Sequence, residues 1–156
     1  MTAENLELSV TRLIDAPVET VWKVATERME DWWCPKPWTV QIVEQDWRAG
    51  GRSALVMRGP NGEEMPHEGV FLEVLPGKRF VFTDAFTAGW HPKGPFMVGT
   101  MEFNDENGKT RYTASARHWT KEACEQHKLM GFEQGWAAVA EQLAALAEAE
   151  KSASTR

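Results

Sequence analysis

Two polar side chains occupy strand positions whose neighbours are aromatic or small, which makes them candidates for contact with a ligand. Asp84 shares the parity of Phe82 in one expected strand, and His118 shares the parity of Ala114 and Ala116 in another. Residues of one parity point to the same face of a strand. If both faces look toward a helix, Asp84 and His118 would hydrogen-bond the polar end of a ligand in an aromatic pocket. The alternative is that each lies at a strand end and reaches solvent or a backbone partner.

Aromatic side chains supply the apolar part of the candidate site. Trp32, Trp33 and Trp38 stand in a segment whose two prolines forbid a continuous helix or a central strand, and Trp90 stands in another loop with Gly and Pro. These residues predict an aromatic rim, which would be a gate over a cavity, a cap on the core or a contact between two copies of the chain. The complete set of predicted ligand-binding residues is Trp33, Trp38, Met57, Phe82, Asp84, Phe86, Trp90, His118, Phe132 and Trp136.

Other chemistries lack their residue patterns. The chain has no Gly-x-Ser-x-Gly, C-x-x-C or H-E-x-x-H motif and no Gly-rich phosphate loop, and Gly50 and Gly51 fit a turn between strands. Cys124 and His127 stand three residues apart on an expected helix, a spacing that a metal could use. At about 100° per residue, however, His127 falls about 150° from the centre of the apolar stripe and is expected to face away from a pocket. We therefore predict no catalytic residue, no metal and no cofactor.

Charge and hydropathy exclude several classes of partner. The net charge is −6, and no basic run offers a surface for nucleic acid or anionic lipid. No stretch approaches the roughly 18 apolar residues of a membrane span, and no secretion signal is evident. We expect a cytoplasmic protein in which Cys34 and Cys124 are free thiols.

Alternating apolar residues predict a sheet that would position these side chains. A half-buried strand over 6–14 carries Arg12 on its otherwise apolar face, and a short helix follows Pro17. Short turns join the later strands, which favours antiparallel neighbours. These strands are expected around 40–42 and over 54–58, 67–75, 79–86, 96–103 and 110–119.

A long amphipathic helix is expected to complete the chain. It begins with Thr120 as its N-cap and runs toward Ala149. The prediction is an α+β fold in which a curved antiparallel sheet of about seven strands wraps around this helix, with short helices after the first strand. Residues 1–149 form a single domain, and 150–156 form a disordered polar tail. The apolar stripe of the helix consists of Leu129, Phe132, Trp136, Val139, Leu143 and Leu146.

Four segments in the same order resemble a known superfamily. They are RLIDAPVETVW at 12–22, AGGR at 49–52, EGVFLEVLPGKRF at 68–80 and GFEQGW at 131–136. The chain resembles the SRPBCC or START-like superfamily over roughly residues 5–147, and within it the branch named after the activator of Hsp90 ATPase homologue. The resemblance implies the helix-grip fold of Bet v 1-like proteins, in which a curved sheet grips a C-terminal helix around a hydrophobic cavity.

The superfamily has many activities, so the resemblance leaves three functions open. The first is a non-enzymatic protein that binds a small hydrophobic or aromatic molecule between sheet and helix. The second is an enzyme like an aromatase or cyclase, in which His118 with Asp84 or Glu125 would donate and accept protons on an aromatic or polyketide-like substrate. The third is an interaction module for an Hsp90-type chaperone. A homodimer is also compatible with the exposed aromatics.

Overall fold

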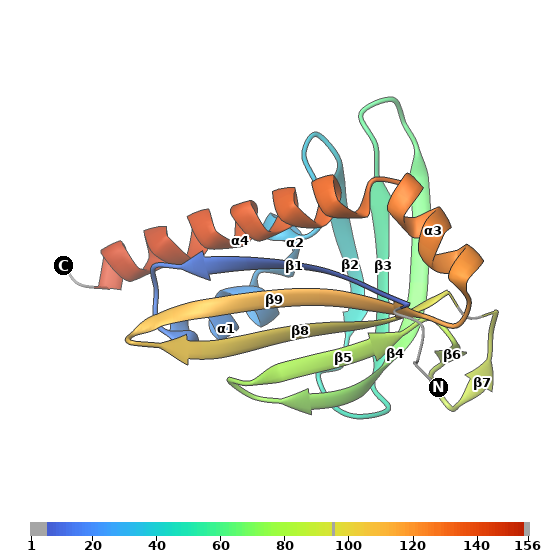
Figure 1. The fold of residues 1–156 in the computed structure, drawn as a ribbon, viewed down its shortest axis with the longest axis horizontal. Coiled ribbons are helices and arrows are strands. Elements are labelled where there is room, and N and C mark those ends of the chain that lie inside the picture. The colour runs from blue at the N-terminus through green and yellow to red at the C-terminus, as the bar shows by residue number, and fades with distance from the viewer. Residues whose placement is uncertain (1–5, 95, 155–156) are drawn as a thin grey trace.

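A computed structural model (Figure 1) describes residues 6–94 and 96–154. Within these ranges the strands form an antiparallel seven-stranded sheet of order β1-β9-β8-β5-β4-β3-β2 and a small hairpin of β6 and β7. The strands of the sheet are β1 (Glu7–Ile14), β2 (Thr39–Gln45), β3 (Arg52–Arg58), β4 (Glu64–Leu75), β5 (Arg79–Thr83), β8 (Met97–Glu106) and β9 (Lys109–His118). The other elements are β6 (Phe86–Thr87), β7 (His91–Pro92), α1 (Val18–Glu27), α2 (Met29–Trp32), α3 (Lys121–Leu129) and α4 (Phe132–Ser154). The predicted helix-grip architecture is confirmed.

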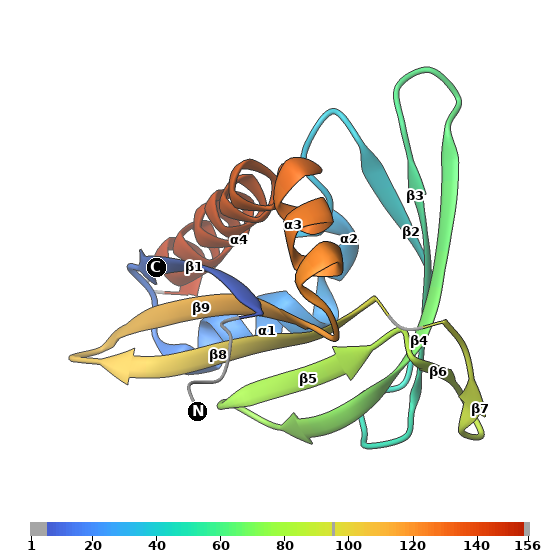
Figure 2. The same cartoon turned by 45° about the vertical axis from the view of Figure 1, so that its right-hand side comes forward.

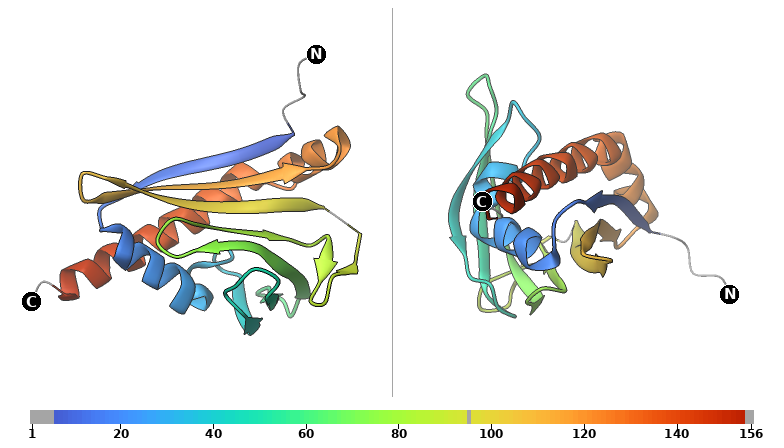
Figure 3. Two further views of the ribbon diagram at one scale, coloured as in Figure 1. Left: turned by 90° about the horizontal axis from the view of Figure 1, so that it is seen from below. Right: turned by 90° about the vertical axis from the view of Figure 1, so that its left-hand side faces the viewer.

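The large sheet bends sharply and presents two walls to the helices. In Figure 2, β2 and β3 stand almost upright against the layer that contains β5, β8, β9 and β1. The bend runs through β4, whose pairing with β5 shifts register between Phe71 and Glu73, as at a β-bulge. A Cβ atom at Gly69 would lie 2.2 Å from the carbonyl oxygen of Thr83, so only glycine permits this approach of backbone to backbone. α1 and α4 lie side by side within the curve (Figure 3).

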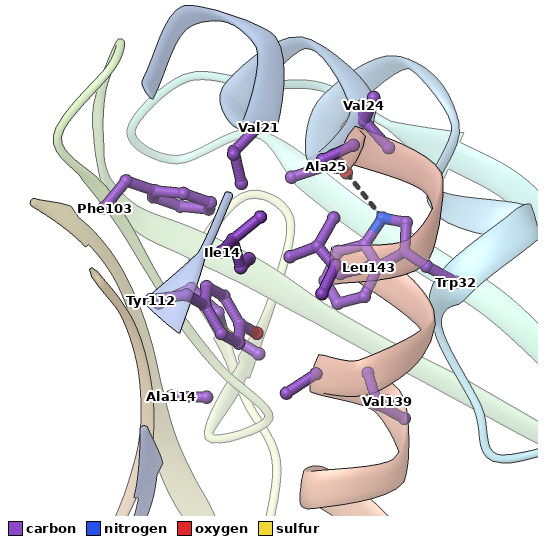
Figure 4. Close-up of a cluster of buried hydrophobic side chains, with 14 of the residues drawn as sticks. Ile14, Val21, Val24, Ala25, Trp32, Phe103, Tyr112, Ala114, Val139 and Leu143 are labelled. Atoms are coloured by element: carbon purple, nitrogen blue, oxygen red, sulfur yellow. Dashed lines mark hydrogen bonds between the residues drawn. The ribbon is translucent and has the colours of Figure 1, made fainter. Parts of the chain in front are cut away.

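A buried apolar core joins α1, α2 and α4 to the layer of β1, β8 and β9. Ile14, Val21, Tyr112 and Leu143 meet there, each at most 1% exposed (Figure 4). Trp32 belongs to the same core and is 0% exposed, so the prediction that places it in an aromatic rim is wrong. The reason is that Trp32 ends the short helix α2, and the proline-containing segment begins only after it.

The C-terminal region forms two helices where the sequence pattern predicts one. Thr120 caps α3 as expected, because its hydroxyl oxygen accepts a backbone N–H of the first turn at 3.1 Å. α3 ends at Leu129, and Gly131 then adopts a left-handed conformation (φ +91°) that no α-helix continues. Leu129 is consequently 87% exposed, so the prediction that it belongs to the apolar stripe is wrong, whereas Phe132 is buried as expected.

α4 is longer than the sequence indicates. It extends to Ser154, where we predict a disordered polar tail over 150–156, and residues 155–156 lie outside the described ranges. Lys151 pairs with Asp15 at 3.0 Å, which gives the polar end of the helix a partner on the chain after β1. In the described part of the chain, no helix has both the length and the apolar character needed to cross a membrane.

The strand predicted over 79–86 ends at Thr83, and the chain leaves the sheet at Asp84. The Oδ1 atom of Asp84 accepts the backbone N–H groups of Phe96 at 2.8 Å and Met97 at 3.2 Å. These bonds hold together the two ends of the excursion that carries β6 and β7. Asp84 therefore lies at a strand end and binds backbone groups, which is one of the two alternatives that the sequence leaves open for it.

Candidate ligand pocket

A pocket of about 380 Å³ lies between the sheet and the helices α2, α3 and α4. β2, β3 and β4 supply one wall, β5 and β8 the floor, and the junction of α3 with α4 the opposite side. Aromatic and methionine side chains make up nearly half of its lining residues, and they combine a large apolar area with adaptable shape. The apolar side chains of the lining include Met29, Trp33, Leu55, Met57, Phe71, Phe80, Phe82, Met97, Met101, Phe132, Trp136 and Val139.

The structure brings some of the predicted site residues together and leaves others outside the pocket. The six that line it are Trp33, Met57, Phe82, Asp84, Phe132 and Trp136. Of the remainder, Trp38 packs beside Val40 and Leu55. Phe86 and Trp90 form an edge-to-face pair at 6.0 Å on the β6–β7 excursion, with Trp90 55% exposed. His118 lies behind the lining and reaches it through a second histidine.

A glutamine of α4 fixes the segment that carries Trp33. The side-chain amide of Gln142 donates to the carbonyl oxygens of Trp32 at 2.9 Å and Cys34 at 3.1 Å. These bonds hold Trp33 edge-to-face with Trp136 at 5.7 Å, so the two rings form one side of the pocket. Cys34 and Cys124 are both free and buried, as predicted, and burial raises the pKa of the Cys34 thiol. Gln142 lies on the helix flank beside the apolar stripe, and the stripe alone gives no reason to single it out.

Two buried histidines stand side by side at the α3 end of the pocket. The Nε2 atom of His118 lies 2.9 Å from the Nδ1 atom of His127, and the Nδ1 atom of His118 lies 2.9 Å from the carbonyl oxygen of Leu6. His118 is 6% and His127 8% exposed. His127 packs against the rings of Phe96 at 4.9 Å and Phe132 at 5.0 Å.

The position of His127 overturns the expectation that it faces away from the pocket. That expectation assumes one ideal helix from Thr120 to Ala149. The break at Gly131 instead gives α3 a direction of its own. Burial, and secondarily the charge of His118, lower the pKa of His127 to about 4. His127 is therefore a neutral imidazole at pH 7.

A polar group without a partner lies at the β2 end of the pocket. Ser53 donates its hydroxyl to the Oε1 atom of Gln45 at 3.1 Å, and both residues line the pocket. The Nε2 atom of Gln45 is buried and has no hydrogen-bond partner among the described residues. A buried donor of this kind costs free energy unless an acceptor reaches it. Nothing in the sequence distinguishes Gln45 from the other glutamines.

Titratable residues gather where β4 meets the segment after β7. His67, Glu68, Asp84 and Lys93 all line the pocket there. The Nζ atom of Lys93 donates to the carbonyl oxygen of Glu68 at 3.4 Å. Burial, reinforced by the charge of Lys93 and opposed by that of Asp84, lowers the pKa of His67. The pocket therefore has a polar edge and an apolar interior.

Among the described residues, His118 is hydrogen-bonded to neither Asp84 nor Glu125, the two acid–base partners considered from the sequence. Both ring nitrogens of His118 are engaged within the protein, and Asp84 is held by two backbone N–H groups. Glu125 is exposed on α3. Among the described residues, no three His, Cys, Asp or Glu side chains come together in a group that could hold a metal ion.

Several solved structures share this architecture. Protein NE0264 from Nitrosomonas europaea is 35% identical, with a TM-score of 0.88 over 97% of this chain and 99% of that one. Protein Ms6760 from Mycobacterium smegmatis is 28% identical, with a TM-score of 0.76 over 91% of this chain and 90% of that one. An AHSA1-like protein from Aeromonas hydrophila shares the fold at 18% identity, with a TM-score of 0.69 over 92% of this chain and 93% of that one. No curated protein matches the chain.

A family model spans most of the two walls and the helices that enclose the pocket. The model described as "Activator of Hsp90 ATPase homolog 1-like protein" matches residues 15–148, which covers the sheet from β2 onward and most of α4. This match agrees with the resemblance seen in the sequence and with the helix-grip fold. The chain belongs to the activator of Hsp90 ATPase homolog 1-like family of the SRPBCC superfamily.

Proposed function

We propose that this protein binds a small aromatic molecule in the pocket between the sheet and the C-terminal helices, without catalysing a reaction on it. The observation that carries the proposal is the pocket itself, whose volume of about 380 Å³ falls in the range of small-molecule sites, roughly 300 to 1,000 Å³. Formation of a homodimer and binding of a chaperone are predictions from the sequence that we do not develop into a proposal.

The chemistry of the walls favours a flat apolar ligand. Trp33 and Trp136 already meet edge to face, and Phe82 lies on the floor that β5 contributes, so an aromatic ligand would find ring edges and faces around it. Met57 and Met101 can adjust their shape to such a ligand at little cost. The polar atoms inside the pocket are few, as is typical of sites in which they orient a ligand.

Gly135 offers a way to fill the pocket without disturbing the core. It lies in the first turns of α4 and lines the pocket, and an added Cβ atom would meet only a Pro35 side-chain carbon at 3.7 Å. Gly135→Leu should therefore place a branched side chain in the ligand space. Gly135→Ala is the matched control, because it brings a similar gain in helix propensity of about 1 kcal/mol with almost no loss of volume.

The experiment compares the wild type and both variants for binding of naphthalene and its substituted derivatives, measured by titration calorimetry and tryptophan fluorescence. We expect the wild type and Gly135→Ala to bind, and Gly135→Leu to bind about tenfold more weakly or not at all. Equal binding by both variants would show that the ligand lies elsewhere. No binding of any derivative by the wild type would overturn the proposed function, and chemical change in a recovered ligand would overturn the non-enzymatic part.

A further inference from the structure

We infer that the ligand carries a hydroxyl group and that the Nε2 atom of His127 accepts its hydrogen bond, so the pocket selects hydroxylated aromatics over bare or etherified ones. The inference rests on the proposed function and names the class of molecule that the pocket takes.

The backbone carbonyl of Leu6 determines where the protons of the histidine pair lie. A carbonyl oxygen can only accept, so the Nδ1 atom of His118, 2.9 Å away, must carry a proton. When the His118 ring is neutral, its other nitrogen is bare, and the Nε2 atom of His118 accepts from the Nδ1 atom of His127 at 2.9 Å. His127 therefore carries its proton on Nδ1, and its Nε2 atom keeps a free lone pair.

The free lone pair belongs to the histidine that lines the pocket. His127 is part of the lining, and His118 is not. The two nitrogens of one imidazole point in nearly opposite directions, so Nε2 points away from His118. The rings of Phe96, Phe132 and Trp136 pack around the imidazole at 4.9, 5.0 and 5.9 Å and hold its orientation. None of the described residues is hydrogen-bonded to this nitrogen.

The chemistry of a bare imidazole nitrogen defines the group that satisfies it. A ligand carbonyl, ether or carboxylate brings only lone pairs and would meet His127 with repulsion. An ammonium group would have to leave water for a pocket whose neighbours here are aromatic, which is costly. A neutral hydroxyl, like a neutral N–H group, donates one hydrogen bond to this nitrogen and leaves the apolar ring of the ligand in contact with Phe132 and Trp136. The pKa of His127, lowered to about 4, keeps the acceptor available at pH 7.

The test compares three probes of one skeleton: 2-naphthol, 2-methoxynaphthalene and naphthalene, titrated into the wild type at pH 7. We expect 2-naphthol to bind roughly tenfold more tightly than either of the others. His127→Phe, which preserves the aromatic contacts, should reduce this preference to about twofold or less. His91→Phe, at an exposed histidine of β7, should leave it unchanged. Equal affinities of the wild type for all three probes would overturn the inference and leave the proposed function intact, whereas no binding of any probe would overturn both.

A second measurement needs no variant and no ligand. The nitrogen chemical shifts of the histidine side chains distinguish a protonated nitrogen from a bare one, and we expect His127 to be in the Nδ1–H tautomer at pH 7. A His127 ring that carries its proton on Nε2 would overturn the inference even if every probe bound.

Discussion

The indole nitrogen of Trp32 donates a hydrogen bond of 3.1 Å to the carbonyl oxygen of Ala25, which ties α2 back onto α1 inside the core. The carbonyl belongs to the last turn of α1, where no later helical N–H is available to it. Replacing Trp32 with Phe removes the donor to this carbonyl and creates a cavity beside it. We expect Trp32→Phe to lower the free energy of unfolding by about 2 to 4 kcal/mol.

Urea denaturation measures this loss, and Trp119 supplies the control. Trp119 is 51% exposed, so Trp119→Phe should change the free energy of unfolding by less than about 0.5 kcal/mol. If Trp32→Phe and Trp119→Phe lowered the free energy of unfolding by the same amount, the buried indole of Trp32 and its hydrogen bond to Ala25 would not stabilise the core as proposed.

The histidine pair makes stability depend on pH. The pKa of His127 falls from 6.5 to about 4 on folding, so between these values the unfolded chain binds more protons than the folded one. The stability that neutral His127 contributes is complete above about pH 6.5 and is lost as the pH falls toward 4, by up to about 3 kcal/mol.

Denaturation curves between pH 7 and 5 check this expectation, because most carboxylates stay ionised over that interval. His127→Phe removes the titrating group, so its free energy of unfolding should vary less with pH than that of the wild type. Parallel profiles for the two proteins would contradict the assignment.

Because the amide nitrogen of Gln45 is buried without a partner, replacing the Gln45–Ser53 pair by apolar residues should not destabilise the ligand-free protein. Ser53→Ala removes the partner of the amide oxygen and should cost about 1 kcal/mol. Adding Gln45→Leu removes the buried donor as well, and the double variant should be at least as stable as the wild type. Thermal unfolding of the three proteins measures the order, and a double variant less stable than the wild type would contradict the prediction.

An ion pair holds the first strand to the last helix. The Nε atom of Arg12 lies 2.6 Å from the Oε1 atom of Glu141, and this bond raises the pKa of the guanidinium. Glu141 is 63% exposed, so solvent screens the pair. A double-mutant cycle with Arg12→Met and Glu141→Gln should give a coupling energy of about 1 kcal/mol or less. A value of several kcal/mol would mean that the pair is effectively buried.

The sequence predicts the fold well because its strands alternate and its turns are short. The seven strands of the large sheet and the cap at Thr120 follow from these local signals. The break at Gly131 is harder to predict, since a glycine within a helical pattern is compatible with a bend, a close approach or a full stop. Only the packing of α3 against the end of β9 decides among them.

The candidate site is predicted less completely, because part of it depends on contacts between residues far apart in the sequence. Parity identifies Phe82, and the helical stripe identifies Phe132 and Trp136, because each of these patterns is local. The location of His127 depends on where α3 points after the break, and the protons of the pair depend on Leu6, more than a hundred residues away in sequence. Neither relation leaves a trace in the spacing of neighbouring residues.

The sheet order has a consequence for how the protein forms. β1 is the first strand of the chain, yet its hydrogen-bonded neighbour is β9, so Glu7 and Arg117 meet across 110 residues. The ribosome must therefore synthesise β9 before β1 can pair with it. Contacts of such long range slow folding, because the entropy of closing the loop is lost before the contact forms. We expect the carbonyl of Leu6, and with it the proton arrangement of the histidine pair, to be among the last features of the native state to appear.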